Sequence, residues 1–210
     1  MVRSAGWHRY ERARPEALAF AGEVAEQEKA KASAPAPAPV PTAPAWGDAF
    51  ELAVDFEINH PEAEGGRYRR PFVAIWVENK DGIVVRNVSL WVSTGGPGPW
   101  EWMKDLKRWH LSDQARKRTD KRDMVLTMSR PTRPPGKYSV IWDGKDDSDK
   151  PLPRGEYTIF IDAAREHGTY QSIQKRVTIG DEPFVFELEG NIEIKSAGLD
   201  YHRKSAAKSR

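Results

Sequence analysis

The chain has 210 residues, of which 39% are hydrophobic and 30% charged, and it contains no cysteine. This length supports one folded domain with extensions, and the lack of cysteine excludes disulfides, thiolate metal sites and cysteine nucleophiles. The 33 lysines and arginines against 31 aspartates and glutamates leave a net charge of +2, which argues against a nucleic-acid partner. Because no run of 18 apolar residues and no charged-then-apolar leader occurs, we expect neither a membrane span nor a cleavable signal within these residues.

The first 45 residues predict an N-terminal extension. Residues 1–33 are rich in Ala, Glu, Arg and Lys and place Leu18, Ala21 and Ala25 at helical spacing, which predicts a flexible amphipathic helix. Residues 34–45 carry a proline at nearly every second position, which favours an extended polyproline linker. We therefore expect a helical and proline-rich extension that holds the following domain away from its attachment point.

Residues 46–200 predict one antiparallel β-sandwich domain. From Phe50 to Ile58 apolar and polar residues alternate, which is typical of a half-buried strand. Further short strands, separated by turn residues, are predicted at residues 72–78, 83–93, 137–142, 157–164, 172–179, 184–187 and 191–195. One short inserted helix is predicted where Trp102, Leu106 and Trp109 follow helical spacing, and residues 201–210 are predicted to be a basic, solvated tail.

A Pro-x-Gly-x-Tyr turn motif occurs twice, and its second copy belongs to a pattern that resembles a known domain family. Residues 134–138 repeat the Pro-x-Gly-x-Tyr order of residues 153–157, so both following strands are expected to begin in the same way. The second copy ends the pattern W-D-G-x-D-D-x-x-x-x-L-P-x-G-x-Y at residues 142–157, which resembles the immunoglobulin-like domain of flagellar hook-capping proteins. The wider stretch from about residue 50 to 195 is similar to a bacterial family of predicted periplasmic domains of unknown function.

The resemblance implies a fold, a location and a type of partner. It implies an all-β, immunoglobulin-like sandwich that is periplasmic or membrane-associated. Members of the family are often found with PepSY-type membrane proteins and flavin transferases, so it also implies a membrane-protein partner or a fused membrane anchor. Our first interpretation is a non-catalytic extracytoplasmic binding or interaction module, accessory to iron uptake or electron transfer, with no cofactor and an unknown small-molecule ligand. The alternatives are a redox domain that carries flavin mononucleotide (FMN) and a metal-dependent enzyme.

The FMN alternative also depends on the resemblance. Family members can carry an Asp-x-x-Ser/Thr-Gly-Ala-Thr element, where a hydroxyl becomes esterified to FMN, just before the Arg-Pro-Pro-Gly turn. This chain keeps the hydroxyls of Ser129 and Thr132, while Leu126, Arg130 and Pro131 replace the Asp, Gly and Ala. An attachment site needs an exposed hydroxyl and small neighbours that admit the phosphate. The competing interpretation is an ordinary loop before a strand.

A tryptophan cluster beside basic residues could bind an aromatic ligand. Trp102 and Trp109 lie within residues 101–133, a segment that carries ten basic and five acidic side chains, and Trp100 directly precedes it. Aromatic rings beside cations can stack on a flavin ring or a base. The competing interpretation is a helix that buries these rings as a plug across an open end of the sandwich.

Two further groups are candidates for metal binding or catalysis. Four acidic residues could supply oxygen ligands to a divalent cation or could cap the hairpin through Asx turns: Asp143, Asp146, Asp147 and Asp149. The catalytic candidates are Arg165, Glu166 and His167, of which the histidine could act as a base or a metal ligand. The five histidines form no H-x-H or H-x-x-x-H pair, so no local metal motif supports this alternative.

Overall fold

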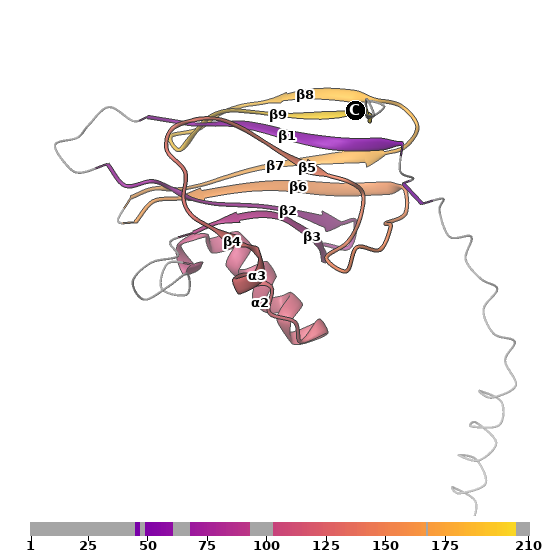
Figure 1. Cartoon of the computed structure of the whole chain (residues 1–210), viewed down its shortest axis with the longest axis horizontal. Helices are drawn as coiled ribbons and strands as arrows, with labels where there is room; N and C mark the ends of the chain where they lie inside the picture. Colours follow the sequence, from indigo (N-terminus) through magenta and orange to yellow (C-terminus); the bar gives the residue numbers. More distant parts are fainter. Residues whose placement is uncertain (1–44, 47–48, 61–67, 93–102, 167, 205–210) are drawn as a thin grey trace, which may run out of the picture. The chain divides into compact units, whose positions relative to one another are not determined.

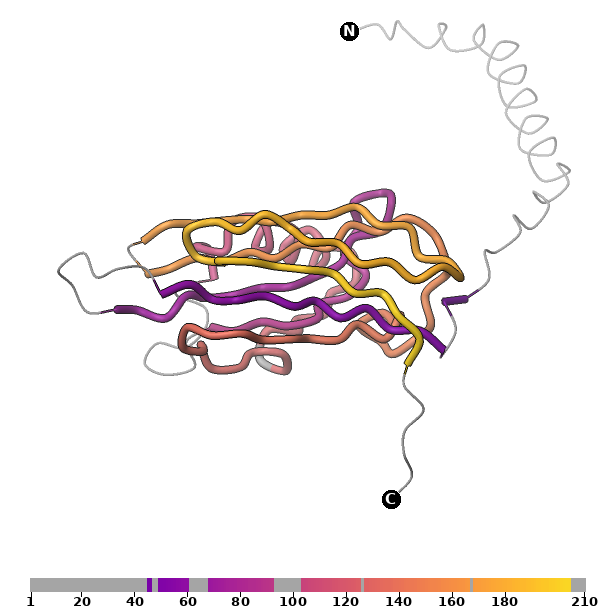
Figure 2. The backbone as a smooth tube through the Cα atoms, turned by 90° about the horizontal axis from the view of Figure 1, so that it is seen from above, coloured from indigo at the N-terminus to yellow at the C-terminus, as the bar shows by residue number. Residues whose placement is uncertain are grey.

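The computed structural model describes residues 45–46, 49–60, 68–92, 103–166 and 168–204, and it confirms the predicted β-sandwich (Figure 1). The strands of both sheets run along the same long axis (Figure 2). The predicted helix and proline linker before residue 45 lie outside the described residues, as do Trp100, Trp102 and His167.

The first sheet has the order β5-β1-β9-β8 and is antiparallel throughout. Its strands are β1 (Phe50–Ile58), β5 (Gly136–Trp142), β8 (Phe184–Leu188) and β9 (Ile194–Arg203). The alternation in β1 has the predicted effect, because Leu52, Val54 and Phe56 are buried in the core while Asp55 is exposed.

The second sheet has the order β4-β3-β2-β6-β7. It consists of β2 (Phe72–Asn79), β3 (Val84–Trp91), β4 (Ser129–Arg130), β6 (Gly155–Ala164) and β7 (Tyr170–Ile179), and only the short β3–β4 pair is parallel. Strand β2 is buried on both faces, because one face meets the first sheet and the other meets a layer of helix. This double burial explains why its sequence is apolar at consecutive positions.

The helical segment covers the outer face of the second sheet (Figure 1). It consists of the 3-10 turn η2 (Met103–Asp105), helix α2 (Lys107–Asp120) and the single turn α3 (Val125–Met128). Leu106 and Trp109 pack with Trp76 and Phe160 in a second apolar cluster. The prediction that this helix plugs an open end of the sandwich is therefore wrong. The helix instead covers the apolar side chains on the outer face of the second sheet.

Helix α2 is also longer than the spacing of apolar residues predicts. It continues through residues 116–120, beyond the segment of Trp102, Leu106 and Trp109 whose spacing predicted it. The Arg116 guanidinium lies 2.8 Å from the Asp113 carboxylate and 3.0 Å from that of Asp120. These pairs at helical spacing stabilise the added turns without an apolar signal.

The twofold turn motif is present as predicted. The Tyr138 hydroxyl donates to the Pro134 carbonyl at 2.7 Å, and the Tyr157 hydroxyl donates to the Pro153 carbonyl at 2.5 Å. The glycine between proline and tyrosine has φ +148° in the first copy and +147° in the second, a region that favours glycine. Burial raises the pKa of Tyr157 to about 12, so this phenol remains a hydrogen-bond donor at neutral pH.

The C-terminal boundary differs from the prediction. We expected a strand at residues 191–195 and a tail from residue 201, but β9 spans Ile194–Arg203. Tyr201 is fully buried, and its ring stacks on Phe50 with the centroids 4.9 Å apart. Gly198 and the charged residues of this segment hide the alternation, which explains why the sequence pattern missed the strand.

Candidate functional site

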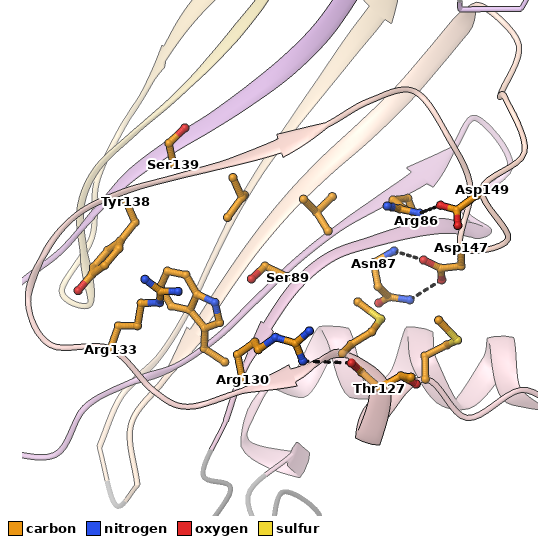
Figure 3. Close-up of a pocket in the computed structure, with 15 residues that line it drawn as sticks. Arg86, Asn87, Ser89, Thr127, Arg130, Arg133, Tyr138, Ser139, Asp147 and Asp149 are labelled. Carbon is orange, nitrogen blue, oxygen red and sulfur yellow. Dashed lines mark hydrogen bonds and ion pairs between the residues drawn. The ribbon is translucent and has the colours of Figure 1, made fainter. Parts of the chain in front are cut away.

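A cleft of about 470 Å³ lies on the side of the sandwich where β3 and β5 face each other across the two sheets (Figure 3). The segment that contains α3 and β4 forms its third wall. The residues that give the cleft its chemistry are three arginines, two aromatic residues and two aspartates: Arg86, Arg130, Arg133, Trp91, Tyr138, Asp147 and Asp149. A volume of this size is typical of ligand sites.

Asp147 closes one end of the cleft by bonding to the edge of β3. Its backbone N–H donates to the Val85 carbonyl at 3.1 Å, and its carboxylate accepts the backbone N–H of Asn87 at 2.8 Å. The second carboxylate oxygen accepts the Asn87 side-chain amide at 2.8 Å. Asp147 thus occupies backbone groups of β3 that a neighbouring strand would otherwise use.

Arg133 lies at the opposite end of the cleft, against two aromatic rings. Its guanidinium carbon is 4.7 Å from the Trp91 ring centre and 5.5 Å from that of Tyr138. The two rings pack edge to face with centroids 5.0 Å apart, which fixes the surface on which the guanidinium rests. Cation–π contact of this kind orients the arginine without neutralising its charge.

Arg130 is oriented by backbone carbonyls. Its Nη1 atom donates to the carbonyl of Thr127 at 3.1 Å and to that of Ser129 at 3.0 Å. Among the described residues no carboxylate lies within ion-pair distance of either Arg130 or Arg133, and both arginines are exposed. Their remaining N–H groups are therefore available to an anion in the cleft.

The positive charge of Arg86, at the Asp147 end of the cleft, is compensated by a carboxylate. Its Nη1 atom donates to the Asp146 carbonyl at 2.6 Å and lies 3.4 Å from the Asp149 carboxylate. The cleft is therefore positive at the Arg130 and Arg133 end, whereas its other end carries one arginine against two aspartates. This distribution favours an elongated ligand whose negative charge lies at the Arg130 and Arg133 end.

A buried carboxylate positions the helix that leads into the cleft. Asp162 on β6 is fully buried, and one of its oxygens accepts the Trp109 backbone N–H at 3.1 Å and the Tyr170 hydroxyl at 3.0 Å. Burial raises the pKa of Asp162, although these hydrogen bonds oppose the rise. Asp162 thus serves as an acceptor at the first turn of α2, whose N–H groups have no partner within the helix.

The hydroxyls proposed for FMN attachment lie in the segment beside the cleft, but neither is fully exposed. The Ser129 hydroxyl donates to the Val125 carbonyl at 2.6 Å, and the carbonyl of Thr132 accepts a long hydrogen bond from Arg70 at 3.4 Å. The exposed Thr127, which the sequence did not single out, lines the cleft itself. FMN attachment at Ser129 or Thr132 therefore stays a prediction.

The four hairpin aspartates do not converge on one point. Asp146 accepts the backbone N–H groups of Ser148 and Lys150 at 2.7 and 2.9 Å, which is the geometry of an Asx turn. Asp143 is 3.5 Å from Lys145, and the other two aspartates bond to β3 residues as described above. Within the described ranges no group of three or more His, Asp or Glu side chains is placed to hold a metal ion.

Two of the catalytic candidates, Arg165 and Glu166, are engaged in separate ion pairs. Arg165 lies 2.6 Å from the nearly fully buried carboxylate of Glu193, and its guanidinium lies over the Tyr68 ring at 5.3 Å. Glu166 pairs with Arg69. These contacts join the β6–β7 connection to neighbouring segments, and a catalytic role for Arg165, Glu166 and His167 stays a prediction.

Trp109 belongs to the hydrophobic packing between helix α2 and the second sheet. It is 3% exposed, and its indole N–H donates to the Asn87 side-chain carbonyl at 3.0 Å. Its ring therefore packs in the outer apolar cluster and offers no stacking surface to a ligand. The residues that do form the cleft come from segments far apart in sequence. The sequence pointed toward them through the basic excess of residues 101–133 and through Asp147 and Asp149, which it suggested as metal ligands.

These features define a two-sheet β-sandwich with an outer helix and an arginine-lined cleft between β3 and β5. The chain belongs to the family described as predicted periplasmic protein (DUF2271), whose model matches residues 52–196. No curated protein and no solved structure matches the chain. The described helices include none that is long and apolar enough to cross a membrane.

Proposed function

We propose that the chain is a non-catalytic extracytoplasmic binding module that holds an anionic ligand at the Arg130 and Arg133 end of the cleft. One observation carries the proposal: ring faces and backbone carbonyls orient these arginines, so their charges remain uncompensated. Guanidinium groups in fixed positions bind carboxylate or phosphate through paired hydrogen bonds. The family description, predicted periplasmic protein, agrees with an extracytoplasmic location.

Titration with inorganic phosphate, followed by calorimetry at low and high salt, tests this proposal. Arg130→Gln and Arg133→Gln should each weaken binding about tenfold, because each removes a charge-assisted contact. Arg176→Gln is the matched control, since this exposed arginine lies on β7, away from the cleft. Equal binding by all three variants would contradict the proposal.

Within the cell envelope we propose that this module serves a membrane-bound partner in iron uptake or electron transfer. The support is the resemblance to domains found with PepSY-type proteins and flavin transferases. Co-purification of the full chain with the membrane protein encoded beside it tests this role, with Arg133→Gln as the variant expected to reduce recovery.

A second candidate is a redox domain that carries FMN. The observation that favours it is the position of Arg130 and Arg133 beside Ser129 and Thr132, where the two cations could neutralise a phosphate. Co-expression with a flavin transferase should then add the mass of one FMN less one water. Ser129→Ala, Thr132→Ala and Thr127→Ala identify the modified hydroxyl, and an unchanged mass of the parent chain removes this candidate.

A further inference from the structure

We infer that the natural occupant of the cleft is an extended acidic segment of another protein, which adds as a strand along the outer edge of β5 and places its carboxylates against Arg130 and Arg133. This inference rests on the proposed anion-binding function and specifies the kind of partner. Three properties of the cleft support it: the open edge of β5, the regularity of that strand and the position of the uncompensated charge.

The two strands that flank the cleft differ at their edges. Strand β3 is bonded by Asp147 at residues 85 and 87 and by β4 at Leu90 and Trp91. Strand β5 pairs with β1 along its whole length, from Gly136 to Trp142, and no described residue bonds to its backbone from the cleft side. One wall of the cleft is thus closed to a further strand, while the other presents unpaired N–H and C=O groups.

Strand β5 has few of the features that normally prevent strand addition. Its register with β1 runs without a bulge over seven residue pairs, so the edge is regular. Lys137 is its single charged residue, and Ile141 is 47% exposed. Edge strands are usually protected by several charges, a proline or a bulge, and proline occurs here only before the strand, at residues 134 and 135.

The charge of the cleft selects an acidic segment. Arg130 and Arg133 lie on the chain segment that faces β5 (Figure 3). Val88 and Val140 give the cleft an apolar part of its lining. In an added strand, alternate side chains point to the same face, so acidic residues at alternate positions would reach the arginines while the backbone bonds to β5. A small anion would use the arginines and leave both the strand edge and the apolar lining empty.

The first experiment uses an eight-residue peptide of alternating glutamate and valine with blocked ends. Two further versions carry N-methyl groups on one or the other set of alternate residues, since only one set of backbone N–H groups can face β5. We expect one methylated version to bind about as well as the parent and the other to bind about tenfold more weakly. A lysine–valine peptide of equal length should not bind, and Arg133→Gln should weaken binding of the parent peptide about tenfold.

The second experiment locates the contact by amide hydrogen exchange. Bound peptide should slow exchange at alternate amides of β5 and leave the amides of β8, another outer strand of the same sheet, unchanged. Equal binding of both methylated peptides, or protection of β8 instead of β5, overturns strand addition. Binding of phosphate without binding of the peptide overturns this inference alone, whereas loss of both also overturns the proposed function.

Discussion

Replacing Asp162 by asparagine and by alanine separates two effects of this buried carboxylate on stability. Asparagine keeps an acceptor for the Trp109 backbone N–H and the Tyr170 hydroxyl, whereas alanine leaves both donors without one. A buried donor that loses its partner costs about 1 to 3 kcal/mol. Because the Trp109 amide is buried and Tyr170 is half-buried, we expect the alanine variant to be about 3 kcal/mol less stable than the asparagine variant.

The charge effect depends on pH. Burial raises the pKa of Asp162 above its ordinary value of 3.8, so the folded state holds this proton more tightly than the unfolded state does. The stability contributed by protonated Asp162 is therefore complete below the unfolded pKa and declines as the pH rises through the folded pKa. Since asparagine does not titrate, Asp162→Asn should gain stability relative to the parent as the pH rises.

Urea unfolding followed by tryptophan fluorescence measures both effects when it is repeated at several pH values between about pH 4 and about pH 7. Asp55→Asn serves as the control, because this carboxylate is exposed on β1. Equal stability of the alanine and asparagine variants would refute the role of Asp162 as an acceptor for α2. If the difference in free energy of unfolding between Asp162→Asn and the parent does not change with pH, the inference that burial raises the pKa of Asp162 is refuted.

Three further substitutions test other parts of the structure. Gly144→Ala should destabilise the fold by about 3 kcal/mol, because φ is +81° and a Cβ would lie 2.5 Å from the Trp46 ring; an unchanged urea midpoint contradicts this. Asp147→Ala should cost about 2 kcal/mol by removing the acceptor at the β3 edge, and serine at the same position should recover part of that loss. Burial opposes protonation of His202, but Asp200 outweighs this effect and raises the histidine pKa. The stability that the protonated histidine contributes is therefore present below about pH 6.5 and is lost as the pH rises through the folded pKa. A His202→Ala variant whose stability has the parent's pH dependence would refute this contribution.

The sequence pattern predicted the elements whose burial is simple. Strand β1 has one buried and one exposed face, so its alternation identified both the strand and the residues that enter the core. Strand β9 was misplaced because Gly198 and charged outer residues interrupt the pattern, although Tyr201 is fully buried. Helix α2 was predicted too short because ion pairs, rather than apolar spacing, stabilise its last turns.

The cleft could not be predicted because no single stretch of sequence contains it. Arg133 depends on Trp91 and Tyr138, which come from different sheets. The basic excess around Arg130 was visible, but its lack of a carboxylate partner is a property of the folded chain. Conversely, the hairpin aspartates formed a conspicuous cluster in sequence, and folding gives each of them a separate partner.

The double burial of β2 has a consequence for how the protein reaches its folded state. Until α2 docks, a species with both sheets already formed would leave Trp76 and Phe160 in contact with water on an apolar face. Such a surface is prone to association between molecules during refolding. The acceptor at Asp162 therefore bears on the yield of soluble protein after dilution from denaturant, and the alanine variant should precipitate at a lower chain concentration than its asparagine counterpart.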